Sequence, residues 1–219
     1  MNRLHFRLPL AALAIFASTS FAADEDGFVP LFNGEDFDGW FVSPEAPASP
    51  WKVQKGGVLA RQSSSSYVWT KETFDDFVLE LEFKLSLGCN SGVFFRTDPE
   101  NPVQGGFEIQ IFDSYGQEAD KHHLGAFYDA REPLVNAAKP AGEWNTFKLH
   151  VQGSKVVIHI NGQKVQDLDI NDWDTVGKNP DGTDNKFKTA LKDLPRTGHI
   201  GLQDHGHNVF YRNIRVKRL

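Results

Sequence analysis

Three short segments carry side chains that could bind a polar ligand or move a proton. They span residues 91–96, 106–113 and 199–205, and in each of them apolar residues recur at every second position. In a strand this alternation sends the apolar side chains into a core and the intervening ones to the opposite face. The side chains predicted on the opposite face are Phe94, Arg96, Glu108, Gln110, His199, Gln203 and His205.

This residue set suits a carbohydrate. Carboxylate, amide and guanidinium groups can hold sugar hydroxyls, and aromatic rings can cover the apolar face of a sugar ring. The candidate rings are Phe94, Tyr115, Phe127 and Tyr128. The alternative is a face that is polar only because water covers it, although such faces usually carry Lys, Thr, Ser and Glu rather than Gln, His and rings.

Histidines raise the question of a metal. Asp204-His205-Gly206-His207 could supply ligands to a divalent ion, and His122-His123 follows Asp120 and Lys121. The spacing is weak support, because no HExxH and no Cys/His ligand set is present. The cofactor therefore stays unknown at this stage, with a divalent metal ion as an open alternative.

Several other chemistries lack their sequence motifs. The chain has no GxSxG nucleophile elbow, no GxxxxGK[ST] phosphate loop and no GxGxxG after a strand. Its one cysteine, Cys89, forms no intramolecular disulfide, and a bystander thiol is the simplest interpretation of it.

The elements that must position these residues are strands. Apolar and charged residues alternate through Phe77–Leu85, and the dipeptides Gly153-Ser154 and Asn161-Gly162 predict tight hairpin turns. Strand-like runs are Trp51 to Arg61, Gly92 to Thr97, Gly106 to Asp113, Phe147 to Gln152, Val156 to Asn161, Ile200 to Gln203 and Val209 to Lys217. The best helical candidate is only Lys186 to Leu191. We therefore expect an all-β, antiparallel two-sheet β-sandwich.

Long irregular stretches are candidates for the functional end of this scaffold. Ser114 to Glu143 and Asn171 to Pro195 are the two longest, and Pro44 to Pro50 is predicted to be a surface loop. No internal repeat or linker divides the chain. We expect a site near one of the two long stretches, with an edge-covering role as the alternative for each.

Residues 1–22 have the features of a secretory leader, and residues 23–219 of a single β-sandwich domain. Arg3 and Arg7 precede the apolar stretch Leu8 to Phe16, and Ser20-Phe21-Ala22 ends on small residues. The leader holds two of the 23 basic residues, so the formal charge moves from −6 to −8. Such a balance argues against nucleic acid and anionic membranes as partners. We expect a periplasmic or secreted protein.

Motifs along nearly the whole mature segment resemble one known family. They are Leu31–Trp40, Asn90–Arg96, Gly106–Ile111, Gly125–Asp129, Gly142–Thr146, Gly198–Gly206 and Tyr211–Arg215. Their order and residues resemble the 3-keto-disaccharide hydrolase domain, formerly a domain of unknown function. The resemblance implies a concanavalin A-like jelly roll that acts on glycosides whose glucose unit carries a ketone at C3. It also implies an upstream sugar 3-oxidoreductase that makes this ketone.

The implied chemistry needs a base, a group that stabilises an enolate, and an acid. A C3 ketone acidifies the hydrogen on C2, so that the C1 aglycone can leave by β-elimination, and hydration then completes a net hydrolysis. We predict Glu108 as the base or a metal ligand, Arg96 with Lys121 at the enolate or hydroxyls, and His205 as the acid. Substrate-binding residues on this view are Phe94, Gln110, Lys121, Tyr128 and Gln203.

Two further functions stay open. The same sandwich can be a non-catalytic carbohydrate-binding or laminin G-like module, because fold does not fix function. It can also be a scaffold subunit for a partner oxidoreductase. Glu, Arg and His on neighbouring strands favour the enzyme.

Overall fold

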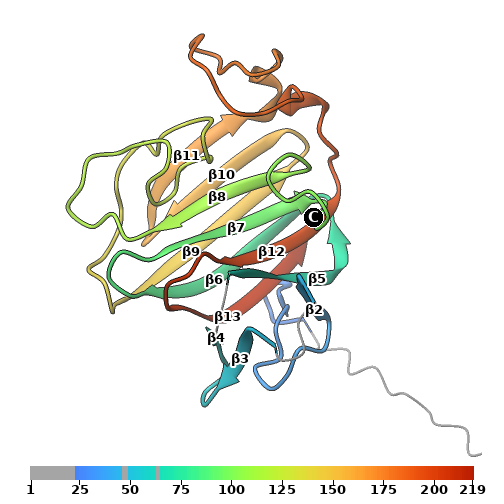
Figure 1. The fold of residues 1–219 in the computed structure, drawn as a ribbon. Helices are drawn as coiled ribbons and strands as arrows, with labels where there is room; N and C mark the ends of the chain where they lie inside the picture. Colours follow the sequence, from blue (N-terminus) through green and yellow to red (C-terminus); the bar gives the residue numbers. More distant parts are fainter. Residues whose placement is uncertain (1–22, 46–48, 63–64) are drawn as a thin grey trace, which may run out of the picture.

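The protein folds as two antiparallel sheets packed face to face (Figure 1). The computed structural model describes residues 23–45, 49–62 and 65–219. The predicted leader, residues 1–22, and part of the Pro44–Pro50 loop lie outside the described residues. In the described part of the chain, no helix is long and apolar enough to cross a membrane.

One sheet has eight strands among the described residues, in the order β11-β10-β9-β6-β13-β4-β3, with β1 paired to β13. These strands are β1 (Val29–Pro30), β3 (Trp51–Gln54), β4 (Val58–Arg61), β6 (Phe77–Leu85), β9 (Trp144–Gln152), β10 (Lys155–Ile160), β11 (Gln163–Asp169) and β13 (Val209–Arg218).

The second sheet has five described strands in the order β2-β5-β12-β7-β8. They are β2 (Trp40–Ser43), β5 (Ser66–Phe74), β7 (Asn90–Thr97), β8 (Phe107–Phe112) and β12 (Gly198–Asp204). The register places Trp69 of β5, Gly201 of β12, Phe94 of β7 and Glu108 of β8 in one row across four strands.

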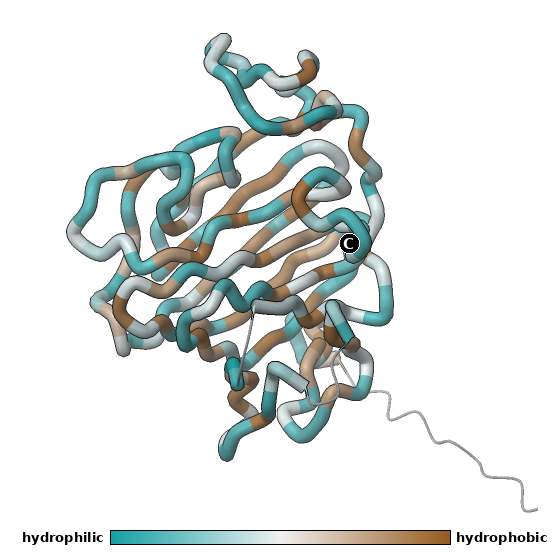
Figure 2. The backbone as a smooth tube through the Cα atoms, viewed as in Figure 1, coloured by the Kyte–Doolittle hydropathy of each residue, from teal (hydrophilic) through white to brown (hydrophobic). Residues whose placement is uncertain are grey.

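The core lies between the two sheets and follows the predicted alternation. Figure 2 shows hydrophobic and hydrophilic residues alternating along the strands. The side chains predicted to point inward from the three segments are all buried, namely Val93, Phe95, Phe107, Ile109, Ile111, Ile200 and Leu202. The prediction of a two-sheet all-β fold is confirmed.

Glycine-containing turns decide where two of the predicted strand runs end. Trp51 to Arg61 is two strands, β3 and β4, because Gly56 and Gly57 turn the chain with φ of 84° and 71°. The predicted Asn161-Gly162 turn joins β10 to β11, and both residues have positive φ.

The helix predicted over Lys186 to Leu191 is wrong. The only helical turns described nearby are two 3-10 turns, η1 (Ile170–Asp172) and η2 (Leu191–Asp193). Both long irregular stretches do lie outside the strands.

Candidate functional site

Aromatic rings form the floor of a site on the outer face of the five-stranded sheet. Tyr67 and Trp69 of β5 are stacked with ring centroids 5.2 Å apart, and Phe94 meets both rings edge-on at 5.5 and 5.6 Å. Gly201 makes this arrangement possible, because a Cβ there would overlap the indole of Trp69. The aromatic floor thus extends across three strands, β5, β12 and β7. Trp69 and Phe94 are fully buried within it, and Tyr67 is the ring of the three that is partly exposed.

Glu108 of β8 lies at the end of this row. Its side chain is half-buried, and its carboxyl lies over Gly92 of β7, where a Cβ would overlap Oε1. Burial raises the pKa of Glu108 to about 8, against a smaller lowering by Lys186. No hydrogen bond from the described residues contributes to this pKa. A half-buried carboxyl without a fixed partner is suited to exchanging a proton with a ligand.

Amide side chains form a second row beside the rings. Gln203 Nε2 donates to the Tyr67 hydroxyl at 3.3 Å, and Gln110 Nε2 donates to Asn90 Oδ1 at 2.9 Å. Gln203 is half-buried, whereas Gln110 is 2% exposed. The predicted positions of Phe94, Glu108, Gln110 and Gln203 on one sheet face are therefore confirmed, while their roles stay predictions.

Two loop residues complete the group around Glu108. The Tyr128 backbone N–H donates to the Glu108 carbonyl at 3.0 Å, which ties the loop to β8. Lys186 Nζ lies 3.6 Å from the centroid of the Tyr128 ring. Burial raises the pKa of Tyr128, as do the carboxyls of Glu108 and Asp129. Tyr128 was predicted from the sequence and Lys186 was not.

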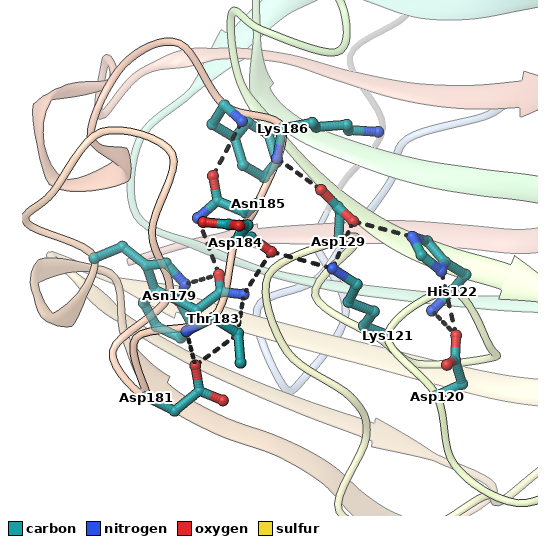
Figure 3. Close-up of polar contacts among 12 residues, drawn as sticks. Asp120, Lys121, His122, Asp129, Asn179, Asp181, Thr183, Asp184, Asn185 and Lys186 are labelled. Carbon is teal, nitrogen blue, oxygen red and sulfur yellow. Dashed lines mark hydrogen bonds and ion pairs between the residues drawn. The ribbon is translucent and has the colours of Figure 1, made fainter.

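Asp129 joins the two long loops (Figure 3). Its Oδ2 accepts the Lys186 backbone N–H at 2.7 Å, and its Oδ1 accepts Lys121 Nζ and His122 Nε2, each at 3.1 Å. Partial burial favours the neutral acid, but these bonds hold the pKa of Asp129 below its usual range. Lys121 also donates to the Asp184 carbonyl at 3.2 Å. Lys121 therefore holds loops together, and no described contact joins it to Glu108.

The expectation that Arg96 shares the face with Glu108 is wrong. Arg96 is 1% exposed, and its guanidinium donates to the carbonyls of Asp75 and Gly153 and to the Asp76 carboxylate, at 2.7–2.8 Å. Its φ of 50° breaks the alternation of β7 at this residue. Arg96 anchors the turn between β5 and β6 to the turn between β9 and β10.

His205 is exposed, just after β12 ends. Asp204 does not bond to its ring in the described contacts, because the Asp204 carboxylate accepts Arg61 Nε and the Gly206 backbone N–H. Among the residues described, no three His, Cys, Asp or Glu side chains gather as a set that could hold a metal ion. Cys89 is buried, and burial raises the pKa of its thiol to about 12.

A wide hollow of about 1020 Å³ lies elsewhere, on the outer face of the eight-stranded sheet. Its carboxylates are already paired, Glu80 with Lys148 and Arg215, and Glu82 with Arg212. These partners outweigh partial burial and keep the pKa of both carboxyls below the usual range. Such groups are permanently charged near neutral pH and are poor proton acceptors, so we place the candidate site at Glu108.

Comparison with known proteins identifies the family and agrees with this fold. Residues 27–217 match the family described as the 3-keto-alpha-glucoside-1,2-lyase-like domain. The chain belongs to this family. It is 28% identical to the 3-keto-disaccharide hydrolase of Bacteroides thetaiotaomicron, over 92% of this chain and 82% of that protein.

Solved structures place the 3-keto-alpha-glucoside-1,2-lyase-like chain among jelly rolls. A candidate glycosyl hydrolase from Parabacteroides distasonis is 31% identical, with a TM-score of 0.79 over 88% of this chain and 99% of that one. The β-glucanase of Bacillus licheniformis has a TM-score of 0.52 at 12% identity, over 92% and 100% of the two chains, which shows the shared fold alone.

Proposed function

We propose that this chain is an exported enzyme that cleaves 3-keto-glycosides, with Glu108 as the base that removes the proton from C2. The carrying observation is the Glu108 carboxyl, which lies over Gly92 at the end of the aromatic row, close enough to Lys186 for its charge to act on it, and has no hydrogen-bond partner among the described residues. Support comes from the family description, which names a 3-keto-alpha-glucoside lyase activity, and from a relative named as a 3-keto-disaccharide hydrolase.

The proposed reaction is an elimination followed by a hydration. Glu108 as carboxylate takes the C2 proton, and the C–H electron pair forms an enolate across C2, C3 and O3. Collapse of the enolate re-forms the ketone, makes a C1–C2 double bond and expels the C1 aglycone, whose oxygen takes a proton from an acid. Water then adds its oxygen to C1 and a proton to C2, which gives a free 3-keto sugar.

The remaining residues of the face have binding roles in this proposal. The half-buried Tyr67 ring covers the apolar side of the sugar, with the buried rings of Phe94 and Trp69 packed beside it. The half-buried amide of Gln203 orients a sugar hydroxyl, and the buried amide of Gln110 supports the face through its bond to Asn90. Tyr128 closes the side nearest the base. His205 stays our candidate for the acid, because it is exposed and directly follows β12, two residues after Gln203.

The pathway around this enzyme follows from its substrate. Ordinary glycosides carry a hydroxyl at C3, so an upstream sugar 3-oxidoreductase must first convert that alcohol to a ketone. The leader-like residues 1–22 support export. Export predicts that the protein recovered from the periplasm or medium begins at Ala23 by mass spectrometry, and recovery with residues 1–22 intact would contradict it.

The test compares p-nitrophenyl 3-keto-α-glucoside with its unoxidised parent in D₂O. We expect nitrophenol release and deuterium at C2 from the ketone alone. Glu108→Gln keeps the shape of the side chain but removes the base, so we expect kcat/KM to fall by about 10³-fold. A parallel assay with a chelator tests the open alternative of a divalent metal ion.

Three results would contradict the proposal. Equal cleavage of both glycosides would indicate direct hydrolysis through a carboxylate pair. Binding of either sugar without turnover would favour the carbohydrate-binding module. Full activity of Glu108→Gln would show that Glu108 is not the base.

A further inference from the structure

We propose that Lys186 is the cationic group that holds the keto oxygen of the substrate while C2 loses its proton, and that Asp129 and Gln104 fix the backbone from which it acts. This inference rests on the proposed action on 3-keto-glycosides. It gives Lys186 the role at the enolate that we predicted from the sequence for Arg96 and Lys121.

The position of Lys186 is the first argument. Its ammonium lies against the face of the Tyr128 ring, at 3.6 Å, and Tyr128 is bonded through its backbone to Glu108. Figure 3 shows the Lys186 side chain pointing away from the polar cluster that surrounds Asp129. Lys186 is close enough to Glu108 to lower the pKa of that carboxyl, yet the described ion pairs include none between them. The Lys186 ammonium thus lies near the proposed base with no described ion pair to it, which leaves it available to a substrate atom.

The second argument is that the cations predicted for this role are engaged elsewhere. Each nitrogen of the Arg96 guanidinium donates to an acceptor at one of two turns. Lys121 bonds to Asp129 and to the Asp184 carbonyl. Neither can reorient toward Glu108 without breaking these contacts, whereas among the described residues Lys186 Nζ contacts the face of the Tyr128 ring and forms no ion pair.

The backbone of Lys186 is held on both sides, which is the third argument. Its N–H donates to Asp129 Oδ2 at 2.7 Å, and its carbonyl accepts Gln104 Nε2 at 3.1 Å. Gln104 Oε1 also accepts the Lys188 N–H at 2.9 Å. Gln104 thus bonds to the backbone of this irregular segment as a neighbouring strand would. Although Lys186 lies outside the helices and strands, its backbone is held in place by the side chains of Asp129 and Gln104.

Electrostatics explain how a bound sugar would strengthen the action of Lys186. In the free protein the residue is exposed overall, although partial burial lowers the pKa of its ammonium against the opposite effects of Glu108 and Asp129. The water that remains around the ammonium weakens its attraction for a nearby charge. A bound sugar displaces that water and strengthens the attraction of the ammonium for a developing enolate oxygen. The titratable groups around Glu108 and its neighbours come from loops and strands. They are Lys186, Tyr128, Asp129 and Lys121 from the loops, Tyr67 from β5 and Tyr211 from β13.

The test uses the full-length mature chain, p-nitrophenyl 3-keto-α-glucoside and three variants. Lys186→Met removes the charge and should lower kcat by about 10²-fold with KM changed much less. Because Lys186 lowers the pKa of Glu108, its loss should also shift the rising limb of the pH–rate profile to higher pH. Lys186→Arg keeps a cation and should retain activity between the two.

Lys188→Met is the matched control, since it removes an exposed ammonium two residues away and leaves the Gln104 bonds to the backbone in place. It should match the wild type. Inactivity of the wild-type protein on the ketone would overturn the proposed function itself. An active wild type with Lys186→Met within threefold of it, or equal losses in both Met variants, would overturn only the assignment of Lys186. Lys186→Arg as inactive as Lys186→Met would overturn the electrostatic role.

Discussion

Two glycine residues are as important to the candidate site as the side chains around them. Glycine at position 92 gives the Glu108 carboxyl its place over β7, and glycine at position 201 does the same for the Trp69 indole over β12. These two glycines thus admit side chains of neighbouring strands close to the backbone.

Gly92→Ala tests this directly. The added methyl would overlap Glu108 Oε1, so the carboxyl must turn away from its present position. We expect kcat/KM on the keto glycoside to fall by about 10-fold to 100-fold, because a misplacement of about 1 Å costs that much. The double variant with Glu108→Gln should lose no more than Glu108→Gln alone. Additive losses would show that Gly92 acts through something other than Glu108.

Arg96 is the residue whose predicted role changes most. Arg96→Met removes the guanidinium from two turn carbonyls and from the Asp76 carboxylate, which keeps only the Gly153 backbone N–H among the described donors. We therefore expect the free energy of unfolding to fall by about 3 kcal/mol in urea titration. Lys164→Met is a control from an exposed ion pair with Asp167 and should cost under about 1 kcal/mol. The folded fraction of Arg96→Met should keep wild-type kcat. A loss of kcat with unchanged stability would show that Arg96 acts in the site after all.

Alternation predicted the strand residues of the site and failed where the backbone departs from it. Glu108, Gln110 and Gln203 follow from a period of two, because each lies within a regular strand with buried neighbours. Arg96 does not, since a positive φ at that residue is invisible in the residue pattern. Tyr67 and Trp69 were missed because β5 is covered on both faces around them and therefore shows no clean alternation.

Among the elements, a strand carries the proposed base and a loop carries the proposed cation. β8 holds Glu108, while Lys186 sits in the irregular stretch between η1 and η2. Residues of such a stretch have no periodicity, so Lys186 could not be predicted from sequence. The signal was indirect, since that stretch had been expected to carry function because of its length.

Gln104→Ala tests whether the loop position matters. The change removes both side-chain bonds to the Lys186–Lys188 backbone, so amide exchange at Lys188 should accelerate and kcat should fall by about 3-fold to 10-fold. Gln117→Ala removes a more distant loop amide that donates to the Asp113 carbonyl at 3.4 Å and serves as the control. Faster exchange with unchanged kcat would separate the order of the loop from catalysis.

At the scale of the whole molecule, Glu108 should leave a mark on the pH dependence of stability. Its folded pKa of about 8 lies above the ordinary value of 4.5, so the folded state binds the proton more tightly than the unfolded state does. The free energy of unfolding should therefore decline as pH rises from about 4.5 to about 8. Ion-paired carboxyls such as Glu80, whose pKa is lowered, act in the opposite direction at lower pH.

Chemical denaturation across this pH range gives the measurement, with Glu108→Gln as the comparison. The variant should be more stable than the wild type at pH 8 and should lose the decline between pH 5 and 8. A wild type and variant with parallel stability curves would show that Glu108 titrates in its ordinary range.

The edge position of β8 ties this chemistry to solubility. An edge strand offers unpaired backbone groups to other chains, and here residues 125–128 cover them, through bonds of Gln110 with Gly125 and Ala126 and of Glu108 with Tyr128. The same bonds hold Tyr128 beside the base. Release of residues 125–128 would leave the edge of β8 unpaired and would also disrupt the candidate site. Molecules damaged in this way would aggregate through the exposed edge instead of remaining in solution as inactive proteins that still bind sugar.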